Sequence, residues 1–197
     1  MERDEAHNAL QLLRKVASQA RDDTAEQNWG IIWFLSAFSN SAGFLGTHVL
    51  MHRGHHTPTP YVGLWVGVFV LNGVWIALFK RPSRGVPTFL EKQIWAIWNT
   101  LIVAMALTAV INYRVGLSPT LFAPAVFAVL AAGTFSIMAT VVQKNWYIPA
   151  ALWALFSLGI TWFPRWQFAL FAVAWGLTQG TAGALLHRAK LRSEAPP

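Results

Sequence analysis

The sequence predicts an all-α, polytopic membrane protein with six transmembrane helices and a cytoplasmic N-terminal amphipathic helix. Its composition is the first indication. Of the 197 residues, 55% are hydrophobic and only 12% are charged, which is about half the charged fraction of a typical soluble domain. The placement of charge is the second. The eight acidic residues all lie outside the long apolar runs, as expected for runs that cross hydrocarbon.

The N-terminal region differs from the rest of the chain because it is mostly polar. Residues 3–21 read RDEAHNALQLLRKVASQAR, in which alanine, leucine and valine recur on one helical face. We therefore divide the chain into a cytoplasmic amphipathic helix at 1–23, a six-helix transmembrane bundle at 24–188 and a cytoplasmic tail at 189–197. The apolar face of 3–21 would contact a cytoplasmic protein, a second copy of the chain or the membrane surface.

Six apolar runs follow, and each is long enough to cross about 30 Å of hydrocarbon. Because the bilayer core offers no water to the backbone, each run is expected to be helical. Thr88 and Glu91 have the spacing of a capping box, which predicts that the third helix begins before its apolar run. The fifth run is the shortest and is expected to borrow residues at either end. The runs lie near Ile31–Met51, Tyr61–Phe79, Ile94–Ile111, Leu121–Val142, Trp146–Trp162 and Phe168–Leu186.

Basic residues predict the orientation of these spans. Only Arg53, Arg114 and Arg165 lie in the second, fourth and sixth polar segments. The positive-inside rule therefore places both termini in the cytoplasm, with the protein in the plasma (inner) membrane. The same rule explains the net charge of +7, so we expect the lipid bilayer as partner and no nucleic acid. The other segments hold Arg3, Arg14, Lys15, Arg21, Lys80, Arg81, Arg84, Lys92, Lys144, Arg188, Lys190 and Arg192.

Small residues recur four positions apart in three of the spans, which is the spacing that lets membrane helices pack closely. We expect these positions to face neighbouring helices, within one chain or between chains. They are Ala42 and Gly46, Gly63 and Gly67, and Gly176, Gly180 and Ala184.

Uncharged polar side chains also lie inside the predicted spans, where they must find hydrogen-bond partners. They would line a polar pathway or bond one helix to another. No aspartate, glutamate, lysine or arginine accompanies them, which disfavours an ion-driven transporter and leaves a passive pathway for a neutral solute open. The polar positions singled out are Ser39, Asn40, Ser41, Asn72, Asn99 and Gln179.

Four of the six histidines fall in the stretch HVLMHRGHH. His48 and His52 share one helix face at the outer end of the first span, and Arg53-Gly54 offers a turn that would bring His55 or His56 back toward them. Three or four neutral imidazoles suit Zn²⁺, Cu²⁺ or Ni²⁺, with an affinity that falls as the pH drops through about 6.5. The alternative is that these are interfacial and loop histidines without a ligand.

The histidine spacing also resembles two of the histidine boxes of membrane fatty-acid desaturases and hydroxylases, which hold two irons. That family spreads its histidines over several boxes, whereas only His7 and His187 lie elsewhere here, at the cytoplasmic side. We therefore exclude a di-iron site. A haem held between two histidines would need His48 and His187 to meet, but we expect them on opposite sides of the membrane. Such a haem would therefore require ligation from one side only or a histidine from a second chain.

No other catalytic motif is present, and the chain has no cysteine. We therefore expect no enzymatic activity and no cofactor other than a metal at the histidines. Two functional classes remain. The first is a non-catalytic sensor, regulator or accessory subunit that meets a cytoplasmic partner. The second is a passive small-solute channel or a metal-handling protein with an outer-face histidine site.

Overall fold

The computed structural model describes residues 28–80, 89–115 and 123–194, and all the regular secondary structure in this part of the chain is helical. The amphipathic helix expected at 1–23 lies outside the described residues. Short 3₁₀ turns η1 (Lys144–Trp146) and η2 (Ile160–Trp162) flank the fifth of six α-helices. The α-helices are α2 (Trp29–His52), α3 (Thr59–Phe79), α4 (Phe89–Arg114), α5 (Ala123–Val141), α6 (Tyr147–Gly159) and α7 (Gln167–Glu194).

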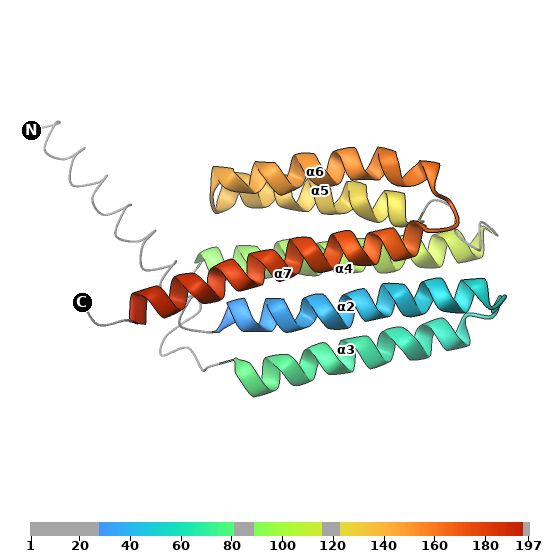
Figure 1. The fold of residues 1–197 in the computed structure, drawn as a ribbon, viewed down its shortest axis with the longest axis horizontal. Helices are drawn as coiled ribbons and strands as arrows, with labels where there is room; N and C mark the ends of the chain where they lie inside the picture. The colour runs from blue at the N-terminus through green and yellow to red at the C-terminus, as the bar shows by residue number, and fades with distance from the viewer. Residues whose placement is uncertain (1–27, 81–88, 116–122, 195–197) are drawn as a thin grey trace, which may run out of the picture.

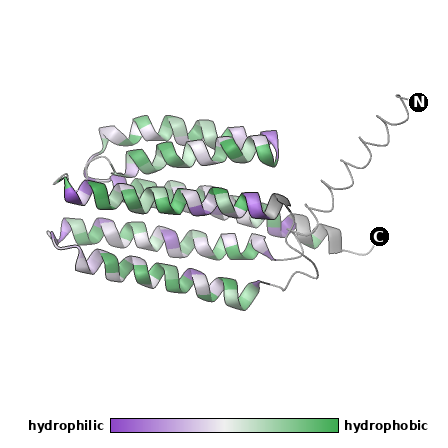
Figure 2. Cartoon of the chain, turned by 180° about the vertical axis from the view of Figure 1, so that it is seen from behind, coloured by the Kyte–Doolittle hydropathy of each residue, from purple (hydrophilic) through white to green (hydrophobic). Residues whose placement is uncertain are grey.

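The helices form one bundle in which each helix runs antiparallel to the one before it (Figure 1). Helix α2 has its most extensive contact with α7 and also packs on α3, whereas α5 packs on both α4 and α6. Hydrophobic residues follow the length of the helices, and hydrophilic residues gather mainly at the helix ends (Figure 2). The bundle therefore has two polar ends and apolar sides, as a membrane-spanning bundle requires.

Four of the described helices are long and apolar enough to cross a membrane: α3, residues Lys92–Arg114 of α4, α5, and residues Gln167–Arg188 of α7. Helix α2 has 24 residues but is more polar, since it carries Ser39, Asn40 and Ser41. Helix α6 has 13 residues, and the adjoining 3₁₀ turns extend its helical path over 144–162, as the short fifth run predicted.

Two helices extend beyond their predicted apolar runs. Helix α4 already includes Phe89, which confirms that it starts before its apolar run. Helix α7 includes residues up to Glu194, so the first part of the segment that we assigned to the cytoplasmic tail is helical. Alanine, lysine, leucine and arginine all favour helix, and no glycine or proline interrupts the chain between His187 and Glu194.

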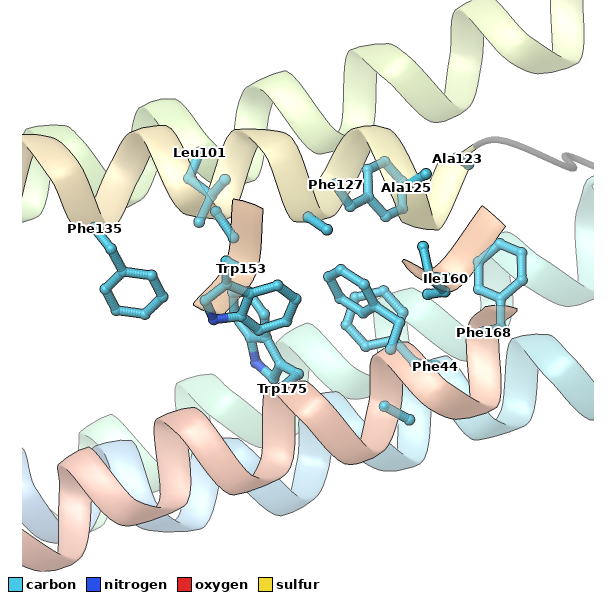
Figure 3. Close-up of a cluster of buried hydrophobic side chains, with 14 of the residues drawn as sticks. Phe44, Leu101, Ala123, Ala125, Phe127, Phe135, Trp153, Ile160, Phe168 and Trp175 are labelled. Atoms are coloured by element: carbon cyan, nitrogen blue, oxygen red, sulfur yellow. The ribbon is translucent and has the colours of Figure 1, made fainter. Parts of the chain in front are cut away.

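An aromatic core joins five of the helices. Phe44 of α2, Trp153 of α6 and Trp175 of α7 converge there (Figure 3). The rings of Trp153 and Trp175 lie 5.8 Å apart, and Phe171 stacks on Trp175 at the same separation. Such ring pairs contribute about 0.5–1.5 kcal/mol each beyond their buried area, so the centre of the bundle is a packed aromatic layer.

Helices α2 and α7 approach each other through glycine. A methyl group on Gly183 would lie 2.5 Å from the backbone nitrogen of Phe34, and one on Gly30 would lie 2.5 Å from the backbone nitrogen of His187. No other residue fits at a contact this close. The expected packing of Gly176 and Gly180 against a neighbour is confirmed, because Ser41 and Ala37 face them.

For three of the small residues, a contact with a neighbouring helix is not confirmed within the described residues. Ala42 is exposed, and the neighbouring Gly43 instead packs against Trp65 and Val68 of α3. Among the described residues, no atom lies within 4 Å of a methyl group added at Gly63 or Gly67. Only one face of α3 meets α2, and the GxxxG pair lies off that face.

Candidate functional site: a polar relay and a histidine pair

Four uncharged polar side chains meet in the middle of the bundle. Ser39 and Asn40 lie near the centre of α2, Asn72 comes from α3, and Gln179 comes from α7. Ser39 is buried, and the other three are half-buried. Adjacent positions on α2 point to different neighbours, which is how one helix reaches both α3 and α7 at the same level.

These four side chains form one continuous chain of hydrogen bonds, which we call the relay. The hydroxyl of Ser39 donates to Oδ1 of Asn72 at 2.5 Å. The amide of Asn72 donates to Oδ1 of Asn40 at 2.8 Å. The amide of Asn40 then donates to Oε1 of Gln179 at 3.3 Å. Three helices are therefore linked through side chains that are 32 to 139 residues apart in sequence.

The relay has a direction, because each asparagine amide accepts on one side and donates on the other. Within such a chain, each bond polarises the next, and the low dielectric of the interior strengthens all of them. The Gln179 amide nitrogen has no acceptor among the residues that the structure describes. The relay therefore ends on α7 in an open donor.

Ser41 makes a second link between α2 and α7. Its hydroxyl donates to the backbone oxygen of Ala172 at 2.8 Å, beside Gly176, where a methyl group would lie 2.6 Å from the Ser41 oxygen. The glycine leaves room for the serine to reach the facing backbone. Five of the six polar positions singled out from the sequence are thus engaged between helices.

Asn99 is the sixth, and the structure separates it from the relay. It lies on the exposed side of α4 and makes no hydrogen bond within the described part of the chain. The side of α4 that carries Trp98 and Leu101 faces the core instead.

His48 and His52 lie at the C-terminal end of α2. The rings of His48 and His52 are 4.1 Å apart, and Trp166 stacks on His48 at 5.3 Å with an interplanar angle of 27°. Nδ1 of His52 lies 3.1 Å from the backbone oxygen of His48. A carbonyl only accepts, so this contact is a hydrogen bond in the tautomer that carries the proton on Nδ1, and that tautomer leaves Nε2 of a neutral His52 with the free lone pair that a metal needs.

His55 and His56 do not join this pair. Gly54 makes the expected turn, with a φ of 73°, and the hydroxyl of Tyr61 then donates to the backbone oxygen of His55 at 2.7 Å. This bond ties the loop to the start of α3. Within the described residues, no group of three or more histidine, aspartate or glutamate side chains is close enough to hold one ion, and the four-histidine metal site stays a prediction.

The aromatic core contains a feature that the sequence reasoning missed. The indole nitrogens of Trp98, Trp153 and Trp175 are buried and have no hydrogen-bond acceptor among the described residues. The ring of Trp175 makes T-shaped contacts with the rings of the other two. Trp65, by contrast, donates to the hydroxyl of Thr47 at 3.2 Å. Packing between helices, rather than position in the sequence, decides which indoles are buried.

Comparison with protein-family models, with curated proteins and with solved structures finds no match to this chain.

Proposed function

We propose that this chain is a non-catalytic integral membrane protein, a sensor, regulator or accessory subunit, that crosses the plasma (inner) membrane six times with both termini in the cytoplasm. The observation that carries the proposal is the relay. Its polar groups are used to bond α2 to α3 and α7, which is what a structural cross-link does. A solute pathway would instead leave such groups facing an open lumen.

The six-span arrangement is supported by the antiparallel bundle and by the distribution of charge. The antiparallel order of the helices puts Lys80, Lys92, Lys144 and Arg188 at one end of the bundle. Lys80 lies over the ring of Trp29 at 5.4 Å, where a headgroup region would solvate the ammonium group. The basic end is the one that the positive-inside rule assigns to the cytoplasm.

The partner in this proposal is a cytoplasmic protein that binds the apolar face of residues 3–21. The test compares two double variants of that segment in native membranes, after chemical cross-linking. Replacing Leu10 and Leu13 with serine should remove the co-purifying protein, because both lie on the apolar face. Replacing Gln11 and Gln19, which lie off that face, with serine should leave it in place. Equal recovery with both double variants would contradict the proposal.

A flux assay separates this function from a passive channel. Purified protein in liposomes is mixed with a hyperosmotic solution of urea or glycerol, and the relaxation of vesicle volume is followed by light scattering. We expect the same rate as in protein-free liposomes. A faster rate that is lost in Asn40→Leu would favour a polar pathway through the relay and would overturn the proposal.

The histidine pair supports a second candidate, a metal-handling protein. Two imidazoles with one free Nε2 on His52 could provide part of a Zn²⁺, Cu²⁺ or Ni²⁺ site. The test is elemental analysis of protein purified without a histidine tag, before and after incubation with Zn²⁺ or Cu²⁺. The matched control carries alanine at His48, His52, His55 and His56. Stoichiometric metal in the unmodified protein alone would support this candidate, and none in either would reject it.

A further inference from the structure

One side of α4 combines a regular apolar pattern with a polar group that has no partner among the described residues. We call this surface the α4 stripe. Its members are all exposed, and they are separated alternately by four and three residues. Val103, Val110 and Tyr113 are 56%, 58% and 48% exposed. The stripe consists of Lys92, Ala96, Asn99, Val103, Ala106, Val110 and Tyr113.

Asn99 places a polar side chain within the α4 stripe. Residues Lys92–Arg114 are long and apolar enough to cross a membrane, and Asn99 lies about 10 Å along the helix from Lys92. That depth is within the hydrocarbon. The neighbouring Thr100 donates to the backbone oxygen of Ala96 at 2.8 Å, so its hydroxyl is satisfied, whereas the amide of Asn99 has no partner among the described residues. Acyl chains offer neither donors nor acceptors, which makes an amide facing lipid costly.

We propose that the α4 stripe is a homodimer interface in which the Asn99 amides of two copies bond to each other. Every copy of a membrane protein inserts in the same direction, so Asn99 of one copy lies at the same depth as Asn99 of another. A two-fold axis along the membrane normal then makes the two helices parallel and brings like residues together. A carboxamide has both a donor and an acceptor, and two of them pair reciprocally.

The rest of the stripe fits such a pair. Alternating steps of three and four residues produce a seam for two helices that cross at about +20°. Ala96 and Ala106 allow close approach on either side of Asn99. One asparagine in an otherwise apolar seam fixes both register and oligomeric state. Lys92 and Tyr113 mark the two ends, from which their polar atoms reach the headgroups.

The uncovered GxxxG face of α3 offers the competing location. Gly63 and Gly67 face open space, but that face carries no polar group that needs a partner, and lipid can cover it. The inference requires only that α4 spans a membrane, and it does not depend on the proposed function.

Cross-linking tests the location, and the absence of native cysteine makes single-cysteine variants straightforward. Val103→Cys lies on the stripe, and Leu177→Cys, 66% exposed near the middle of α7, is the matched control. Membranes are oxidised with copper phenanthroline and run on a non-reducing gel. We expect disulfide-linked dimers of Val103→Cys and none of Leu177→Cys. Dimers of Gly67→Cys without dimers of Val103→Cys would place the contact on α3 and overturn the proposal.

The dimerisation equilibrium tests the role of Asn99. Labelled protein is diluted into liposomes at increasing density, and the dimer fraction is counted by single-molecule photobleaching. Asn99→Leu should weaken dimerisation by about 3- to 30-fold, and Asn99→Gln, which keeps the donor and acceptor, should recover most of the loss. At dilutions where the protein is monomeric, thermal unfolding should be unchanged in both, since Asn99 makes no hydrogen bond within the described part of its own chain. A monomer at every density, or an unchanged equilibrium for Asn99→Leu, would refute the interface.

Discussion

The close approach of α2 and α7 yields a sharp prediction about two glycines. In Gly183→Ala, the new methyl group would meet backbone atoms of the facing helix, 2.5 Å from the nitrogen of Phe34 and 2.7 Å from the oxygen of Gly30. Neither atom can rotate away as the end of a side chain can. The two helices must therefore move apart by about 1 Å to restore van der Waals contact, which weakens every other contact along their seam.

The magnitude follows from comparison with Gly63→Ala on α3. Both changes gain the same intrinsic helix propensity of about 1 kcal/mol, but an added methyl at Gly63 meets nothing within 4 Å. The difference between the two variants is thus the steric cost alone, about 1–3 kcal/mol. Gly63→Ala should be as stable as the unmodified protein or slightly more so, and Gly183→Ala should be clearly less stable than Gly63→Ala.

Unfolding in mixed detergent micelles, followed by tryptophan fluorescence, measures both free energies. The aromatic core provides the signal, because rings of α2, α6 and α7 separate when the bundle opens. The reasoning would be refuted if Gly183→Ala and Gly63→Ala unfolded at the same detergent fraction. It would also fail if Gly183→Ala were the more stable of the two.

Three further predictions follow from the described contacts. Asn40→Leu removes one donor and one acceptor from the relay and should lower the free energy of unfolding by about 1–2 kcal/mol. The control is Ser136→Ala, because the Ser136 hydroxyl bonds only to Ala132 of its own helix, and it should change that free energy by less than about 0.5 kcal/mol. Equal losses in the two variants would argue against the relay. Trp65→Phe keeps a ring but loses the bond to Thr47, so a loss of about 1 kcal/mol is expected, against no change for Trp162→Phe, which is 80% exposed. If the histidine pair binds Zn²⁺, calorimetry should show an affinity that falls as the pH is lowered, because protonated imidazole cannot ligate. His52→Ala should lose binding, and His56→Ala should retain it.

The helices themselves were largely predictable from the sequence. Each apolar run corresponds to an α-helix, and the predicted turn at Arg53-Gly54 lies where the chain turns after α2. These features are local: a run of apolar residues must satisfy its own backbone, and a glycine with positive φ ends a helix whatever surrounds it. The capping-box spacing of Thr88 and Glu91 is also a local feature, and it predicted that α4 begins before its apolar run.

The partners of individual side chains were not predictable in this way. The sequence offered Asn72 and Asn99 as equivalent polar groups in two apolar helices, yet Asn72 joins the relay and Asn99 faces outward. Likewise Gly43, rather than Ala42, meets α3, and Trp166 stacks on His48. Helical spacing shows which residues share a face, but the rotation of each helix about its axis decides what that face meets.

The sequence by itself therefore determined that this protein is an all-helical bundle with apolar sides and polar ends. Only the tertiary structure decided that Asn40 bonds to both α3 and α7, that α2 and α7 touch through glycine, and that no described residue covers the GxxxG face of α3. The physical reason is that backbone hydrogen bonding and burial are satisfied within each segment. Helix-to-helix contacts instead depend on the fit of all six helices together.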